Sequence, residues 1–130
     1  MNVAEPKIVT RFINSNVMID RNGRVTSKAY NTVDNRRNKE ISVYNIDNEL
    51  KNNNEKGIYA HSKNMRNKPF ARADLSVSDI KKISEPVQLY LEKSKRLFDK
   101  HCNIKPFPDE WQHAEIVASS LALISKLHYK

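Results

Sequence analysis

Residues 40–46 of the chain read EISVYNI, a stretch in which apolar and polar side chains alternate. This period of two is typical of a half-buried β-strand, because successive side chains of a strand point to opposite faces of its sheet. Residues 7–13 are rich in β-branched side chains, and residues 70–77 alternate again. We therefore expect each of these three stretches to be a strand of one sheet.

Turn-forming residues separate these expected strands. Asn22-Gly23 lies between residues 16–19 and residues 24–27. Both residues of this dipeptide readily adopt the positive φ of a type I′ turn, so we predict a β-hairpin there. Residues 30–37 are polar and indicate a loop, and Asp47 is placed to cap a short helix that ends before Gly57.

The spacing of apolar residues changes to three and four after Pro86. This spacing predicts an amphipathic helix that ends near Asn103, before two prolines. The residues that recur with this spacing are Val87, Tyr90, Leu91, Ser94, Leu97, Phe98 and His101.

A last helix is expected from Asp109 onward, because Asp109 and Gln112 have the spacing of a capping box. Its alanines at 114, 118 and 122 favour close packing. An alternative places residues 113–116 in a strand and begins the helix near Ser119. With strands first and helices last, the chain is expected to be one α+β domain over residues 1–130. A mainly antiparallel sheet from the N-terminal half would be packed by C-terminal helices.

Positive charge is the main functional signal of the sequence. The formal net charge is +8, and residues 61–105 hold 11 Lys and Arg against five Asp and Glu. The last 25 residues are slightly acidic. An uneven basic surface attracts polyanions, so we expect a nucleic acid or an acidic protein as partner.

Several function classes are not supported by the sequence. Cys102 is the only cysteine, so no intramolecular disulfide is expected, and the first residues do not have the pattern of a signal peptide. No stretch is apolar enough to span a bilayer, which predicts a cytoplasmic protein. The two glycines exclude a glycine-rich phosphate loop, and no metal-ligand spacing occurs. We expect no cofactor and no metal.

The first hypothesis is a small basic binding or accessory protein without enzymatic activity. On the expected helix after Pro86, cations at i, i+3 and i+7 line one face, and other cations lie just upstream. Such side chains release counterions from a phosphate backbone. The predicted binding residues are Arg72, Lys81, Lys82, Lys93, Arg96 and Lys100.

The alternative is a small enzyme, such as a toxin or defence effector, that acts on a nucleotide or RNA phosphate. His113 would be its acid–base group, since Asp109 and Glu110 precede it by four and three residues on a helix. Arg11, Lys28 or Arg72 would steady the anion, and the candidate catalytic set is His113, Ser27, Lys28 and Asp74. A further alternative is a homo-oligomer that pairs through the alanine-spaced face of the last helix.

Short motifs along most of the chain also resemble a group of proteins. They are residues 11–13, 23–30, 41–44, 73–75 and 113–116, which read RFI, GRVTSKAY, ISVY, ADL and HAEI. In this order they are similar to small uncharacterised bacterial proteins that are encoded near mobile elements or phage-defence genes. The resemblance implies a defence context but no established activity. It also favours the strand over residues 113–116 and draws attention to Ser27, Ser42, Asp74 and His113.

Overall fold

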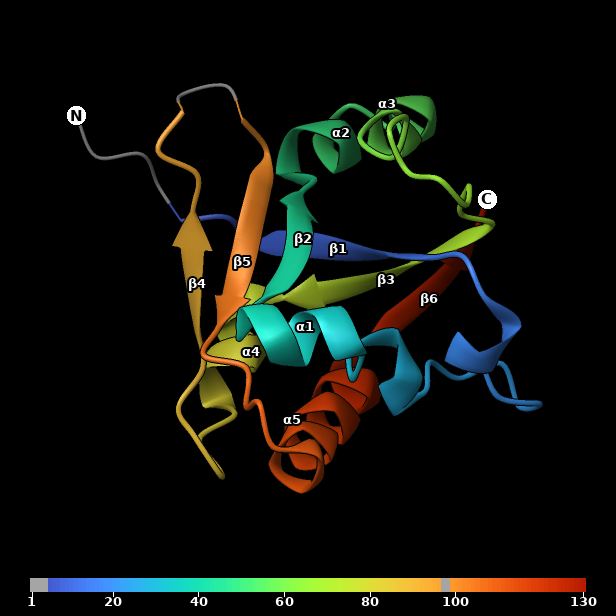
Figure 1. Ribbon diagram of the computed structural model, residues 1–130. Helices are drawn as coiled ribbons and strands as arrows, with labels where there is room; N and C mark the ends of the chain where they lie inside the picture. The colour runs from blue at the N-terminus through green and yellow to red at the C-terminus, as the bar shows by residue number, and fades with distance from the viewer. Residues whose placement is uncertain (1–4, 97–98) are drawn as a thin grey trace.

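The computed structural model describes residues 5–96 and 99–130. Their strands form one six-stranded antiparallel sheet, and helices pack against it (Figure 1). The order of the strands across the sheet is β4-β5-β2-β1-β3-β6. Their bounds are β1 Ile8–Ile13, β2 Ile41–Asn45, β3 Ala71–Ser76, β4 Tyr90–Lys93, β5 His101–Lys105 and β6 Lys126–Tyr129.

Helices cover the two faces of the sheet unequally. In Figure 1, α2 and α3 lie above β1, whereas α1 and α5 lie below it. The bounds of the helices are η1 Asn16–Met18, η2 Ser27–Ala29, α1 Val33–Asn38, α2 Asp47–Lys51, α3 Glu55–Ala60, α4 Val77–Lys82 and α5 Trp111–Ile124.

The main core lies on the face of the sheet that carries Val9 and Ile13, which we call the core face. Helix α5 packs there through its fully buried side chains, which are Ala114, Val117, Ala118 and Leu121. Complete burial of a side chain such as Leu121 stabilises a fold by roughly 1.5–3 kcal/mol. This repeated apolar burial, together with the small alanines, fixes α5 against the sheet.

The opposite face, which we call the outer face, has a smaller apolar cluster. Phe12, Ile46, Ile58 and Tyr59 pack together where α2 and α3 cover β1 and the end of β2. The side of the sheet formed by β4 and β5 is not covered in this way. There the outer-face side chains are exposed or half-buried. On the core face, Leu91, Cys102 and Ile104 are buried and Lys93 is exposed.

Most of the expected framework is confirmed. The fold is α+β with an antiparallel sheet, and the three expected strands are β1, β2 and β3. A short helix begins at Asp47, and α5 is continuous through residues 113–116, so the alternative strand there is wrong. The N-cap of α5 is Glu110, whose carboxylate accepts hydrogen bonds from the backbone N–H groups of Gln112 and His113.

The helix expected after Pro86 is wrong. Its residues form β4, a turn and β5, while Leu97 and Phe98 lie outside the described residues. Leu91, Cys102 and Ile104 alternate into the core as strand residues do, whereas Tyr90 and His101, which the expected helix grouped with Leu91, lie on the outer face. Without β5, one edge of strand β2 would have no partner strand. Pairing with β5 satisfies backbone N–H and C=O groups of β2 that would otherwise be left to water.

Three local predictions also need correction. The Asn22-Gly23 turn forms, with Gly23 at φ 75°, but the expected hairpin strands are reduced to one bridge between Ile19 and Val25. Residues 33–38 form α1 in place of a loop, because Thr32 Oγ1 accepts a hydrogen bond from Asn35 N and caps the helix. The helix that begins at Asp47 does end before Gly57, but Gly57 is not just beyond its end, since it lies inside the next helix, α3.

Candidate functional site

The turn between β4 and β5 brings several cations together at one end of the sheet. Lys95 and Arg96 are exposed, and Lys100 is half-buried. Among the described residues, none of these three side chains lies within ion-pair distance of a carboxylate, and the charge of Arg96 acts on Asp99 only at longer range. We call Lys95, Arg96 and Lys100 the hairpin cations. They are available to an external anion.

Hydrogen bonds around Asp99 hold the shape of this turn. Ser94 Oγ donates to Asp99 Oδ2 at 3.0 Å, and the backbone N–H of His101 donates to Asp99 Oδ1 at 2.9 Å. The His101 N–H, aided by Ser94 Oγ, lowers the pKa of the Asp99 carboxyl below its usual value. Asp99 therefore links Ser94, at the end of β4, to His101, at the start of β5.

An open hollow of about 390 Å³ lies beside the hairpin cations. It reaches from the turn down to the outer face of β5. Its lining residues are Glu92, Lys93, Ser94, Lys95, Arg96, Asp99, His101 and Asn103. The hollow therefore connects the cationic turn to the uncovered part of the outer face.

The uncovered part of the outer face carries polar and aromatic side chains from three strands. We call it the outer-face platform, and its residues are Ser42, Tyr44, Tyr90, Glu92, His101, Asn103 and Lys105. His101 Nε2 lies 2.9 Å from Ser42 Oγ, and the His101 ring meets Tyr44 edge-on at 5.6 Å. Lys105 Nζ lies 3.4 Å from Glu92 Oε2. These contacts fix the platform side chains in place.

The predicted binding residues divide into three groups. Lys93, Arg96 and Lys100 lie together in the β4–β5 hairpin, although on strands and a turn and not on a helix. Lys81 and Lys82 lie on α4, where they pair with Glu5 and Asp79.

Arg72, the remaining predicted binding residue, is 3 % exposed. It pairs with Asp74 at 3.1 Å and also with Glu55. Burial lowers the pKa of the Arg72 guanidinium, but Asp74 and Glu55 outweigh it and raise that pKa above its usual value. Because its charge is satisfied inside the protein, Arg72 is not available for binding.

The candidate catalytic residues are not brought together. Ser27 Oγ donates to Glu115 Oε2 at 2.8 Å on the core-face side, whereas Asp74 is buried on the outer face beside Arg72. Lys28 is exposed at η2. His113 is exposed on α5, 3.6 Å from Glu110 Oε2.

The hollow beside His113 contains one lysine, Lys39, and neither Arg11 nor Arg72. Arg11 donates to the carbonyl oxygens of Ala29 and Ser42 from the core face. The geometry therefore does not support the phosphate site that was expected around His113.

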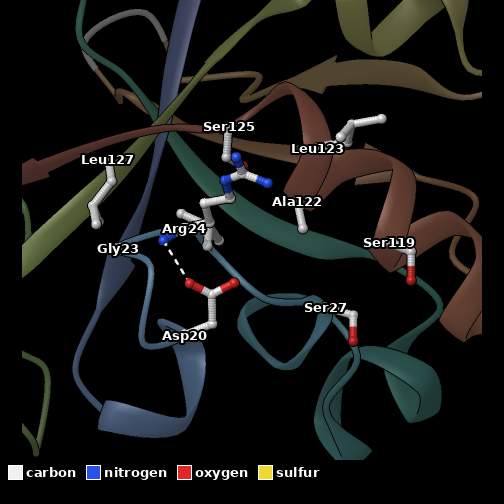
Figure 2. Close-up of a pocket in the computed structure, with 10 residues that line it drawn as sticks. Asp20, Gly23, Arg24, Ser27, Ser119, Ala122, Leu123, Ser125 and Leu127 are labelled. Atoms are coloured by element: carbon white, nitrogen blue, oxygen red, sulfur yellow. Dashed lines mark hydrogen bonds between the residues drawn. The ribbon is translucent and has the colours of Figure 1, made fainter.

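Another hollow, of about 630 Å³, lies between the Asn22-Gly23 turn and α5 (Figure 2). Arg24 and Asp20 both line it, so its two ionic groups have opposite charge. Ser27 and Ser125 are already engaged, by Glu115 and by the carbonyl of Leu121. This hollow adds no net attraction for a polyanion.

Cys102 and the histidines do not form a metal site. Burial raises the pKa of the Cys102 thiol, which points to the core face and donates to Lys100 O. No group of three or more potential metal ligands occurs in residues 5–96 and 99–130. In the same parts of the chain, no helix has both the length and the apolarity to cross a membrane.

The alanines expected to pair two copies of the chain are turned inward. Ala114 and Ala118 are fully buried against the sheet, and Ala122 lies partly buried against the same core. The solvent side of α5 instead exposes Ile116 and Leu123. An oligomer through the alanine face is therefore incompatible with this packing.

Comparison of the chain with protein-family models, curated protein sequences and solved structures finds no match.

His101 and Tyr90 are among the platform residues that the sequence did not lead us to propose as binding residues. Both were placed on the apolar side of a helix. The alternation in residues 101–105, HCNIK, is the signal that predicts a strand with His101 and Asn103 on its polar face.

Proposed function

We propose that this protein is a nucleic-acid-binding protein that contacts phosphates through its β4–β5 hairpin. The observation that carries the proposal is the group of three hairpin cations that form no internal ion pair among the described residues. The hairpin forms one margin of the molecule in Figure 1, at the left of the view. The sequence resemblance adds a bacterial defence context to this proposal.

The physical basis is the release of counterions. Each phosphate that a Lys or Arg neutralises frees condensed cations, so affinity falls as salt rises. Arg96 adds a planar donor group that binds a phosphate with two hydrogen bonds. Other cations of the chain, such as Lys81 and Arg72, are paired with carboxylates and contribute less.

The experiment measures binding of a labelled oligonucleotide over a series of salt concentrations. The double variant Lys95→Ala/Arg96→Ala is compared with Lys81→Ala/Lys82→Ala, which loses the same charge from α4. We expect the hairpin variant to bind about 25- to 60-fold more weakly near 0.1 M salt, with a salt slope reduced by about 1.4 to 1.8. The α4 variant should change much less.

Equal losses in the two double variants would overturn the assignment to the hairpin. Binding that is independent of salt would overturn the electrostatic proposal itself. If a polyglutamate peptide binds more tightly than the oligonucleotide, an acidic protein is the better partner.

A further inference from the structure

The outer-face platform lies directly beside the hairpin cations, and only its Tyr44 end is covered, where the ring packs on Phe12 and stacks with His61. Its side chains come from paired positions on three strands: Tyr90 opposite Lys105, Asn103 between Glu92 and Ser42, and His101 opposite Tyr44. All seven are exposed or half-buried. On the core face of the same strands, Leu91, Ile104 and Ile41 are buried.

Two rings of the platform are placed to meet flat ligands. Tyr90 is 48 % exposed on the edge strand β4. His101 lies at the other end of β5, four residues from the position opposite Tyr90, which is about 13 Å along the strand. An extended strand of a few nucleotides covers this distance.

Polar groups lie between the two rings. Asn103 lines the hollow, and its Oδ1 is buried without a hydrogen-bond partner within the described chain. The Lys105–Glu92 pair lies on the same strip of the sheet. An amide group such as that of Asn103 pairs with the edges of unstacked bases.

We propose that the platform binds single-stranded nucleic acid, with bases stacked on Tyr90 and His101 while phosphates follow the hairpin cations. This inference rests on the proposed function and specifies its ligand. Stacking needs an exposed base face, which a duplex keeps inside its own stack. The hollow, of about 390 Å³, joins Lys95 and Arg96 to His101, and Tyr90 lies beyond it on the neighbouring strand β4.

The test compares Tyr90→Leu with Tyr129→Leu. Tyr129 is a matched control, because it is a 62 % exposed tyrosine on β6 at the opposite edge of the sheet. Three probes are titrated against each protein: a 12-nucleotide oligothymidylate, a 12-base-pair duplex and inorganic polyphosphate. Thermal melts by circular dichroism establish that both variants are folded.

We expect Tyr90→Leu to bind the oligothymidylate about 5- to 100-fold more weakly than the wild type, with polyphosphate binding unchanged. Tyr129→Leu should match the wild type with every probe. The wild type should prefer the single strand to the duplex.

Two outcomes would overturn the inference. One is equal oligothymidylate affinity for the two tyrosine variants, and the other is tighter binding of the duplex. In either case, salt-sensitive binding of polyphosphate would leave the hairpin proposal standing. If none of the probes binds in a salt-sensitive way, the proposed function fails as well.

Discussion

Two regions of this molecule contain cationic side chains in opposite environments, one buried and the other exposed. Near β6, Arg72 is buried between Asp74 and Glu55, and Thr10 and His128 also contact Asp74. At the other edge of the sheet, Lys95 and Arg96 are exposed and have no internal ion pair among the described residues. The first region joins strands together, whereas the second is available to a ligand.

The difference shows that the sequence alone does not reveal which charged side chains are available to a ligand. A buried charge must be paired, so the position of Arg72 on the outer face of β3 requires nearby carboxylates. A charge on a turn remains hydrated and needs no partner. Substitutions in the first region should therefore change stability, and substitutions in the second should change binding.

The largest expected effect is on stability, from Arg72→Met. The change leaves Asp74 buried without its cation, so we expect the free energy of unfolding to fall by about 3–5 kcal/mol. Urea denaturation measures it. The double variant Arg72→Met/Asp74→Leu should recover most of the loss, because no charge stays unpaired. A loss below about 1 kcal/mol for the single variant would remove the contrast between the two regions.

Arg11→Leu should have the next largest effect. The Arg11 side chain donates to Ala29 O and Ser42 O at 3.1 Å, and burial lowers the pKa of its guanidinium. Leucine would leave both carbonyl oxygens without this donor, at a cost of about 1–3 kcal/mol in the free energy of unfolding. Chemical denaturation with Arg11→Lys as control measures it, since lysine keeps a donor. A leucine variant as stable as the wild type would contradict this role.

Glu92→Gln tests whether release of a paired cation strengthens binding. Glu92 neutralises Lys105 on the platform, and its carboxylate raises the pKa of the Lys105 ammonium. Freeing one cation for one phosphate should raise the affinity for oligothymidylate about 5-fold near 0.1 M salt. Asp79→Asn, which frees Lys82 on α4, is the control and should leave affinity unchanged. Equal gains in both variants would mean that net charge alone sets the affinity.

The smallest effect should come from Glu110→Ala. Backbone N–H groups of Gln112 and His113 lower the pKa of the Glu110 carboxyl from 4.5. A lowered pKa in the folded state stabilises the fold above the unfolded pKa, and the contribution is lost as pH falls through the folded value. The variant should therefore melt at a slightly lower temperature than the wild type at pH 7. The gap should close at pH 3, and a gap that is unchanged would exclude this carboxylate cap.

Sequence patterns correctly predicted the strands and the helix whose side chains follow a single pattern of burial. Residues 8–13, 41–45 and 71–76 have one buried face or are buried throughout, and their composition identifies them as strands. Helix α5 is long, capped and apolar on one side, so its start was within two residues of the expected one. The prediction of a helix over residues 87–101 was wrong because strand pairing places Tyr90 and Leu91, which both belong to the three-and-four spacing, on opposite faces of β4.

The candidate site could be predicted only in part. The basic composition of residues 61–105 is a property of the sequence, and it placed Lys93, Arg96 and Lys100 among the binding residues. The importance of Tyr90 and His101 depends on strand pairing, since a strand partner decides which side chains share a face. The same holds for Arg72, whose partners Glu55 and Asp74 come from α3 and β3.

The sequence by itself determined an α+β chain with a last helix and a cationic segment before it. Those properties follow from local periodicity and composition, which act over a few residues. Only the tertiary structure decided which cations are paired and which aromatic rings lie on an open sheet face. The physical reason is that burial and ion pairing depend on neighbours far apart in sequence, such as Arg72 with Glu55 and Ser42 with His101.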